Sequence, residues 1–300
     1  MDTREHISRL KAERNAIVLA HNYCSPEVQD LADFVGDSLA LAIKAAETDA
    51  DVIVFCGVKF MAEGAKLLNP EKVVLMPEPD ALCPMASMCT PEGIAAMRAR
   101  HPEAAVVGYV NSTADSKAEM DICCTSANAE GVVGSLDEEE VIFVPDANLG
   151  AYVQTLLPEK RILLWEGYCP THQAITPAMI AALKEAHPEA EVLMHPECRP
   201  EALAMADFVG STAGILARAK ESPAQEFIVG TETGMLHRLN QDVPGKTFIG
   251  VDCAVCPPMK MCNPESILRS LRDDVGRLDL EGPQLEPARK ALERMLDLRD

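Results

Sequence analysis

Residues 32–38 read ADFVGDS, and residues 206–212 read ADFVGST. Extending the alignment outward from these two copies reveals a third, more divergent copy between them. The three aligned segments are NAIVLAHNYCSPEVQDLADFVGDS (15–38), AAVVGYVNSTADSKAEMDICCTS (104–126) and EVLMHPECRPEALAMADFVGST (191–212). Their shared positions align without gaps, and self-similarity of this kind indicates that one structural unit has been repeated.

Side chains of similar chemistry recur at fixed positions in the three copies. Corresponding positions are separated by 86 to 88 residues along the chain. They are His21, Tyr109 and His195; Asp33, Asp121 and Asp207; Ser38, Ser126 and Thr212; Lys72, Lys160 and Lys246; and Cys83, Cys169 and Cys256. Because these spacings agree, the sequence predicts a triplicated unit of about 87 residues.

Within one repeat the pattern alternates between strand and helix, beginning and ending on a strand. Apolar runs such as AIVLA (16–20), DVIVFCG (51–57) and KVVLM (72–76) are short and scarcely alternate, as in strands covered on both faces. Ser25 followed by Pro26 is typical of a helix start. Alternating strands and helices predict a parallel sheet between helices. The predicted fold class is therefore α/β, with three homologous αβα domains related by pseudo-threefold symmetry around a central site.

The repeat spacing also predicts the domain boundaries. The first domain is expected to span residues 1–84, the second 85–170 and the third 171–263. Two amphipathic segments remain, ESILRSLRDDVGRL and EPARKALERMLDLRD. We expect these C-terminal helices (264–300) to pack on the first domain.

Composition excludes several functional classes. The 300 residues include 27 Lys and Arg against 47 Asp and Glu, a formal net charge of −20. Binding to nucleic acid requires a basic surface, so we expect no nucleic-acid partner. No apolar run approaches the roughly 18 residues of a membrane span, and the N-terminus MDTREHISRLKAERN is charged. We therefore expect a cytoplasmic protein with no membrane partner.

The chain contains eleven cysteines. A cytosolic protein of this size does not need a disulfide framework, so some of them are expected to bind metal or perform redox chemistry. Cys83, Cys169 and Cys256 occupy equivalent repeat positions, and Pro follows each. Equivalent positions around one axis can converge on one ion or cluster. Three thiolates would hold a four-iron cluster with one iron free to act as a Lewis acid, or a zinc ion with one open position.

The other cysteines divide into two groups. Cys253 forms a CxxC pair with Cys256, which would allow a regulatory disulfide when no metal is bound. The remaining seven show no matching pattern across the repeats and are expected to pack as small apolar residues. They are Cys24, Cys56, Cys89, Cys123, Cys124, Cys198 and Cys262.

Polar residues follow the first strand of each repeat. These segments are 21–23 (HNY), 109–111 (YVN) and 195–197 (HPE). Ligands of open parallel sheets bind at the carboxyl ends of the strands, so three such ends would meet at one centre. His, Tyr, Asn and Glu side chains suit proton transfer and polar recognition.

Hydroxyl side chains open the next helix of each repeat, at Ser38, Ser126 and Thr212. They either cap these helices or bind a carboxylate or phosphate at the helix N-terminus. The equivalent aspartates, Asp33, Asp121 and Asp207, are interpreted as structural residues that fix the turn after the first helix.

Several motifs together resemble quinolinate synthase. They are AHNY (20–23), ADFVGDS (32–38), CPM (83–85), YVNST (109–113), CTSAN (124–128), CPTHQ (169–173), HPEC (195–198), GTETGM (230–235) and CAVCPPMK (253–260). The resemblance implies a transferase of de novo NAD biosynthesis that condenses iminosuccinate with dihydroxyacetone phosphate, giving quinolinate, phosphate and water. It also implies a three-domain fold and a [4Fe-4S] cluster held by three cysteines, with one open iron as Lewis acid.

The resemblance assigns roles to particular residues. The implied cluster ligands are Cys83, Cys169 and Cys256. The implied substrate-binding residues are His21, Ser38, Tyr109, Asn111, Ser126, His172, His195, Glu197 and Thr212. The implied catalytic residues are Tyr23, Tyr109, His195 and Glu197, with Tyr23 and Glu197 in acid–base steps. A transient contact with the enzyme that produces iminosuccinate is a further expectation.

Two other functions remain open at this point. One is a different three-cysteine [4Fe-4S] enzyme of reductive or radical type, similar to the diphthamide-synthesis or HMBPP-reductase enzymes, which would need an electron donor. The other is a non-enzymatic iron–sulfur or zinc sensor, which predicts no central pocket of convergent polar groups.

Overall fold

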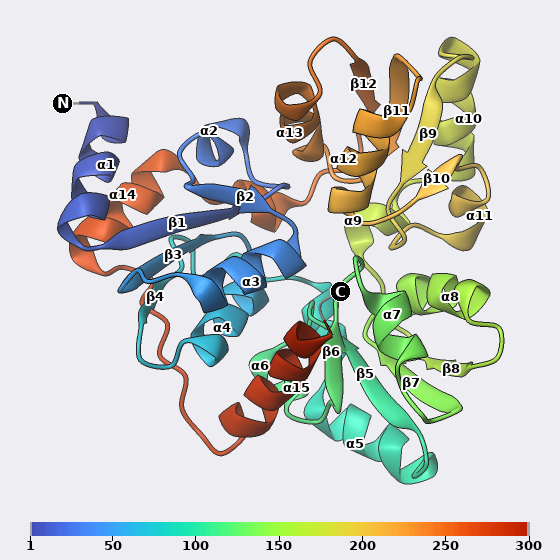
Figure 1. Ribbon diagram of the computed structural model, residues 1–300, viewed down its shortest axis with the longest axis horizontal. Coiled ribbons are helices and arrows are strands. Elements are labelled where there is room, and N and C mark those ends of the chain that lie inside the picture. Colours follow the sequence, from blue (N-terminus) through green and yellow to red (C-terminus); the bar gives the residue numbers. More distant parts are fainter. Residues whose placement is uncertain (1, 299–300) are drawn as a thin grey trace.

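The computed structural model describes residues 2–298 and contains three separate four-stranded sheets (Figure 1). The strand orders are β2-β1-β3-β4, β6-β5-β7-β8 and β10-β9-β11-β12, so each sheet has the same order within its own repeat. Every strand pair within these sheets is parallel. The predicted α/β class with three small parallel sheets is confirmed.

The elements follow the predicted alternation in each repeat. The first part of the chain contains α1 (Thr3–Glu13), β1 (Ala16–His21), α2 (Pro26–Gln29), β2 (Phe34–Gly36), α3 (Ser38–Glu47), β3 (Val52–Cys56), α4 (Lys59–Leu68), β4 (Val73–Leu75) and the 3-10 helix η1 (Met85–Met88). The second contains α5 (Pro91–Arg100), β5 (Ala105–Tyr109), α6 (Ala114–Lys117), β6 (Ile122–Cys124), α7 (Ala129–Gly134), β7 (Glu140–Val144), α8 (Ala147–Leu156), β8 (Arg161–Leu164) and α9 (Pro170–Gln173). The third contains α10 (Pro177–Ala186), β9 (Glu191–Met194), α11 (Pro200–Leu203), β10 (Phe208–Val209), α12 (Thr212–Glu221), β11 (Glu226–Gly230), α13 (Met235–Asp242), β12 (Thr247–Gly250) and the 3-10 helix η2 (Pro257–Lys260). The C-terminal helices are α14 (Pro264–Asp273) and α15 (Leu285–Asp297).

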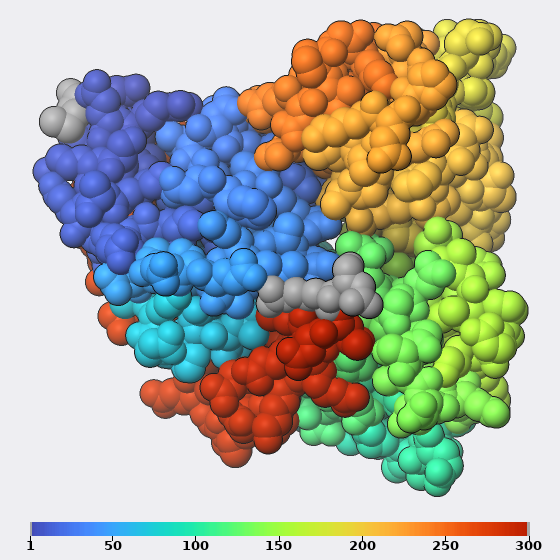
Figure 2. Space-filling view, viewed as in Figure 1, coloured from blue at the N-terminus to red at the C-terminus, as the bar shows by residue number. Residues whose placement is uncertain are grey.

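Strand register is the same in the three sheets. Leu19 pairs with Phe34, Val107 with Ile122, and Leu193 with Phe208. Each sheet is complete within one repeat, and the repeats form three lobes that meet in the middle of the face in Figure 2. We therefore propose domain boundaries after residues 84 and 170, as the repeat spacing predicts. With these boundaries, η1 belongs to the second domain and α9, apart from its first residue, to the third.

The equivalent aspartates fasten the first strand of each repeat to the turn before the second. The carboxylates of Asp33, Asp121 and Asp207 accept the backbone N–H groups of β1, β5 and β9 at 2.8, 2.7 and 2.8 Å. The backbone N–H of each aspartate donates to the carbonyl of the same strand residue at 2.9 Å. Their structural role is thus a two-way bond between chain segments 15 residues apart.

The strands bury both faces, as their unalternated sequences predict. In β1, Leu19 belongs to the large central core, whereas Val18 and Ala20 belong to a second core on the opposite face. The central core contains residues from all three repeats and from α15, so it joins the lobes. Among the described helices, none is both long enough and apolar enough to cross a membrane.

The two C-terminal helices do not pack alike. Helix α14 contacts α1 and β3 of the first repeat, as predicted. Helix α15 instead contacts α4 of the first repeat and both α6 and β6 of the second, and Figure 2 shows it between those lobes. Helix α15 thus packs on the first domain through α4, and it packs on the second as well, which the prediction did not include. Its apolar face, with Leu292 and Met295, is buried in the core that the lobes share.

Replacing Asp207 with Ala should lower the free energy of unfolding by about 1–2 kcal/mol, because the N–H of Val192 loses its charged acceptor. Urea unfolding followed by circular dichroism measures this change. Asp207→Asn is the matched control, since it keeps an oxygen acceptor. An Asp207→Ala midpoint equal to that of the wild type would contradict the structural role.

Candidate functional site

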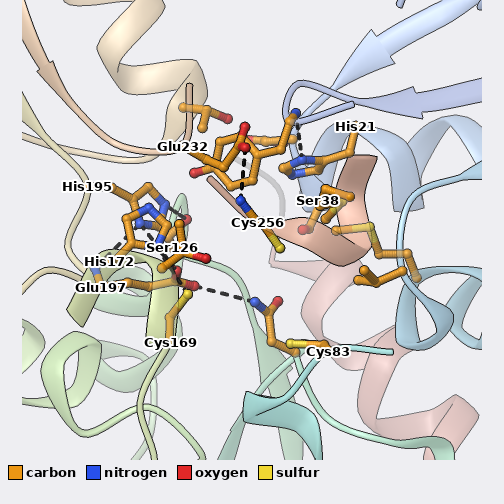
Figure 3. Close-up of a pocket in the computed structure, with 18 of the residues that line it drawn as sticks. His21, Ser38, Cys83, Ser126, Cys169, His172, His195, Glu197, Glu232 and Cys256 are labelled. Atoms are coloured by element: carbon orange, nitrogen blue, oxygen red, sulfur yellow. Dashed lines mark hydrogen bonds and ion pairs between the residues drawn. The ribbon is translucent and has the colours of Figure 1, made fainter. Parts of the chain in front are cut away.

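The carboxyl ends of the first strands meet at one cavity between the three repeats (Figure 3). The cavity holds about 600 Å³ of space outside protein atoms, part of it open to solvent. It brings together all of the predicted site residues: His21, Tyr23, Ser38, Cys83, Tyr109, Asn111, Ser126, Cys169, His172, His195, Glu197, Thr212 and Cys256. Residues up to 235 positions apart in sequence thus line one space, since Cys256 and His21 both border it.

His21 and His195 are equivalent residues with the same local geometry. In each, Nδ1 accepts a backbone N–H two residues later, from Tyr23 at 3.1 Å and from Glu197 at 3.4 Å. Burial lowers the pKa of both rings to about 3, so both are neutral near pH 7. With Nδ1 as acceptor, the proton of each ring is assigned to Nε2. The Nε2–H of His195 lies 3.1 Å from Ser126 Oγ.

Glu197 is a buried acidic residue of the cavity. It is 3% exposed, and its Oε1 accepts the Tyr109 hydroxyl at 2.6 Å and the Asn111 amide at 3.4 Å. Its Oε2 lies 2.6 Å from His172 Nδ1. Burial alone would raise the pKa of this carboxyl, but the charge and hydrogen bond of His172 hold it below its usual range. Glu197 is therefore ionised.

The two tyrosines stay protonated. Burial, with the Glu197 charge as a second cause, raises the pKa of both Tyr23 and Tyr109 well above the usual value. The Tyr23 hydroxyl lies 2.7 Å from Thr231 Oγ1, which in turn lies 2.9 Å from His172 Nε2. A continuous chain of hydrogen bonds therefore connects Tyr23 to Tyr109 through Thr231, His172 and Glu197.

The predicted helix-opening hydroxyls are not the capping groups. Asp37 caps α3 by accepting from Ala40 N at 2.9 Å, and Ser211 caps α12 by accepting from Gly214 N at 3.2 Å. Ser38 and Thr212 are the first residues inside these helices. The capping alternative is wrong for both because the cap lies one residue earlier.

The third hydroxyl differs slightly from the other two. Ser126 lies three residues before α7, whose N-cap is Asn128. All three hydroxyls line the cavity. They therefore border the open space of the cavity, where Thr212 Oγ1 also accepts the Asn22 amide at 2.9 Å.

The three equivalent cysteines reach the cavity from three loops. Cys83, Cys169 and Cys256 are half-buried free thiols, labelled in Figure 3. Burial raises the pKa of each thiol, that of Cys83 to about 12. A bound metal would reverse this effect, because a coordinating thiol is deprotonated by the ion. The donor set fits a metal cluster that needs three thiolates from three directions.

The remaining cysteines are mostly buried, as predicted, but two of them do match across repeats. Cys24 and Cys198 occupy equivalent positions, and their thiols lie 3.3 and 3.4 Å from the carbonyl oxygens of Cys56 and Gly230. The prediction that these seven show no repeat pattern is wrong for this pair. Cys253 is exposed and unpaired, with its Sγ 3.6 Å from Met179 Sδ.

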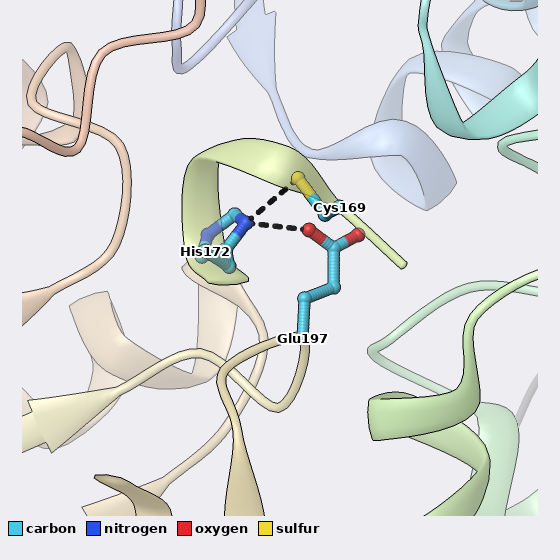
Figure 4. A group of neighbouring side chains, drawn as sticks. All are labelled: Cys169, His172 and Glu197. Atoms are coloured by element: carbon cyan, nitrogen blue, oxygen red, sulfur yellow. Dashed lines mark hydrogen bonds and ion pairs between the residues drawn. The ribbon is translucent and has the colours of Figure 1, made fainter. Parts of the chain in front are cut away.

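Cys169, His172 and Glu197 form a compact group in which one donor atom of each lies within 4.8 Å of the others (Figure 4). The His172 Nδ1 is 3.2 Å from Cys169 Sγ and 2.6 Å from Glu197 Oε2. Two donor atoms bound to the same tetrahedral zinc ion lie about 3.3 Å apart or more, because each metal–ligand bond is about 2.0–2.3 Å long. The 2.6 Å between His172 Nδ1 and Glu197 Oε2 is too short for that. The His172–Glu197 contact is therefore a hydrogen bond in this arrangement.

The sequence predictions assigned no role to Glu232, which lines the cavity, or to Thr231 and Lys260, which contact its lining residues. Glu232 is fully buried and accepts from Cys256 N at 3.1 Å and from Gly234 N at 2.6 Å. Lys260 binds the Glu232 carboxylate at 2.9 Å and the Tyr23 carbonyl at 2.7 Å. Glu232 and Thr231 lie in GTETGM, so the motif was visible, but the repeat alignment alone gave neither residue a function.

Comparison with known proteins gives a consistent result over nearly the whole chain. The family model described as quinolinate synthetase A protein matches residues 5–297. Quinolinate synthase 1 of Methanosarcina acetivorans is 53% identical over 296 residues, covering 98% of this chain and 97% of the relative. Quinolinate synthases of Methanosarcina barkeri and Geobacter sp. strain M21 are 53% and 50% identical, covering 97% and 98% of this chain and 96% of each relative. The chain therefore belongs to the quinolinate synthase family of enzymes.

Proposed function

We propose that the chain condenses iminosuccinate with dihydroxyacetone phosphate, as a transferase, to form quinolinate, inorganic phosphate and two molecules of water. The observation that carries this proposal is the convergence of polar residues and three thiols from three repeats on one cavity.

The atoms of this reaction balance without any oxidant or reductant, so the reaction needs acid–base groups and a Lewis acid rather than an electron donor. This separates it from the reductive and radical alternatives. The lined cavity also disfavours a sensor, which requires none.

Cys83, Cys169 and Cys256 would hold the [4Fe-4S] cluster, because they are the equivalent thiols that border the cavity. When bound, a cluster with three protein ligands supplies an open iron as a Lewis acid. Glu232 fixes the loop of one of these ligands by accepting the backbone N–H of Cys256.

The dicarboxylate would bind through neutral donors. His21 and His195 present Nε2–H groups, and Ser38 and Ser126 present hydroxyls. Helix α3 adds the partial positive charge of its N-terminus beside Ser38. Buried hydrogen-bond donors of this kind hold an anion in place without a counter-charge next to it.

Proton transfer would use the buried carboxylate and the two phenols. The ionised Glu197 would accept a proton from a carbon or nitrogen of the substrate. Tyr109 donates to Glu197, and Tyr23 lies at the other end of the hydrogen-bond chain. Both phenols are protonated and can act as acids when water leaves. Asn111 Oδ1 is buried without a hydrogen-bond partner among the described residues and can accept an N–H of the substrate.

Anaerobically purified protein should contain about four irons and form quinolinate from the two substrates, as a [4Fe-4S] enzyme requires. Iron and sulfide analysis with chromatographic detection of quinolinate measures both. Cys83→Ala, Cys169→Ala and Cys256→Ala should each lose the cluster and the activity, whereas Cys253→Ala, the exposed neighbour, should keep them. Variants of all three ligands that kept cluster and activity would refute the assignment, and a colourless zinc protein would refute the cluster.

Glu197→Gln should lower kcat by about 10²-fold or more, because the amide cannot accept the substrate proton. The visible absorption of the cluster should remain, since Glu197 is not a proposed ligand. A variant of wild-type activity would remove Glu197 from the mechanism.

Thr231→Val should lower kcat by about tenfold with a smaller effect on KM, because the valine cannot hydrogen-bond to Tyr23 and His172. Thr231→Ser keeps the hydroxyl and should restore most of the rate. Steady-state kinetics of the two variants distinguish this positioning role from a packing role, in which serine would rescue nothing.

A further inference from the structure

Two buried side chains occupy equivalent positions behind the cavity loops. Gln29 is the last residue of α2, and Lys117 is the last residue of α6. They are separated by 88 residues, the spacing of the first two repeats. Gln29 is 4% exposed and Lys117 is fully buried. The third repeat has Leu203 at this position, at the end of α11.

Both side chains make the same contacts to the loop that follows the first strand. Gln29 Nε2 donates to the carbonyl oxygens of Asn22 and Cys24 at 3.0 and 2.9 Å. Lys117 Nζ donates to the equivalent carbonyls, of Val110 at 2.8 Å and of Ser112. The side chain between each pair of carbonyls, Tyr23 or Asn111, lines the cavity. A donor at this position therefore fixes a loop that carries a site residue.

A neutral donor satisfies this requirement in the first repeat, so the positive charge of Lys117 calls for a separate explanation. Among residues 2–298, no carboxylate forms an ion pair with Lys117. Burial lowers the pKa of Lys117, and the nearby Glu63 carboxylate offsets only part of this effect. A glutamine would keep the two hydrogen bonds with no buried charge to stabilise. The charge is thus not needed to hold the loop.

The ammonium lies directly behind one wall of the cavity. Its Nζ is 5.6 Å from the centre of the Phe60 ring. Phe60, Met61 and Ser38 border both the central cavity and the smaller cavity that Lys117 lines. This wall has low polarity, so it screens a charge less than water does.

We propose that Lys117 supplies the positive charge that attracts an anionic group of the substrate to the Ser38–Asn111 side of the cavity. The anion is a carboxylate or a phosphate, and only its assignment to iminosuccinate or the triose phosphate rests on the proposed function. The loop is held by hydrogen bonds and the ligand is attracted by charge, so one side chain performs two separable tasks.

The test substitutes glutamine, the residue that the first repeat has at the equivalent position, Gln29. Lys117→Gln should keep the two hydrogen bonds to the loop and removes the positive charge. The matched control is Lys246→Gln. Lys246 Nζ also donates to two backbone carbonyls, those of Ala219 and Ser222, and lies 5.3 Å from the centre of the Phe227 ring. Unlike Lys117, it does not line the smaller cavity next to the central one.

The experiment measures binding of succinate and of inorganic phosphate to the anaerobically prepared protein by calorimetry. Lys117→Gln should weaken binding of one of these anions about tenfold, raise the corresponding substrate KM similarly and leave kcat nearly unchanged. The affected probe identifies the anion: succinate for the dicarboxylate, phosphate for the triose phosphate. Lys246→Gln should change neither constant. Equal weakening in both variants, or unchanged affinity and KM in Lys117→Gln, would overturn the inference.

A second measurement does not depend on the variant folding. In wild-type protein carrying ¹³C-labelled lysine, addition of either succinate or inorganic phosphate should shift the Cε resonance of Lys117, whereas the Lys246 resonance should stay in place with both. An unmoved Lys117 resonance at saturation contradicts the inference. Quinolinate formation by the wild type tests the proposed function separately, because a protein that binds the anion through Lys117 but makes no quinolinate contradicts only that function.

Discussion

The ionised Glu197 carboxylate, buried away from water, sets the arrangement of the cavity. Such a group is stable only if its oxygens are hydrogen-bonded. Its partners come from different parts of the chain: Tyr109 and Asn111 from the second repeat, and His172 from helix α9. The lobes must therefore meet at a fixed distance for this carboxylate to remain ionised, and the same contacts place the phenols beside it. Packing of the lobes and the arrangement of the proposed acid–base groups thus both depend on this buried carboxylate.

Much of this site could be predicted from sequence because the chain repeats. A triplicated unit with parallel strands has three equivalent strand ends, and equivalent ends meet around a common centre. His21 and His195 illustrate the strength of this inference, since both have the same Nδ1 hydrogen bond two residues along the chain. The three cysteines that end the repeats lie at the same cavity for the same reason.

What could not be predicted depends on contacts between repeats rather than within one. Thr231 bridges Tyr23 and His172, which come from other parts of the chain, so no spacing indicates its role. Helix α15 has the amphipathic pattern of a capping helix, but the pattern does not specify which lobes it covers. The capping residues were misplaced by one because Asp37 and Ser38 are both common helix-start residues, and only backbone geometry decides which of them caps α3.

Equivalent positions of the three repeats carry different side chains, and this difference allows the cavity to recognise asymmetric substrates. The position two residues after each first-strand histidine or tyrosine holds Tyr23, Asn111 and Glu197, which offer an acid, an amide and a base from three sides. A perfect threefold site would present three identical groups, which could not treat the two proposed substrates, a dicarboxylate and a triose phosphate, differently. In the same way, Gln29 has a neutral amide and Lys117 an ammonium, although each side chain donates to the same two backbone carbonyls of its repeat. Shared backbone geometry therefore fixes where each side chain points, and substitution at each copy decides what chemistry it brings.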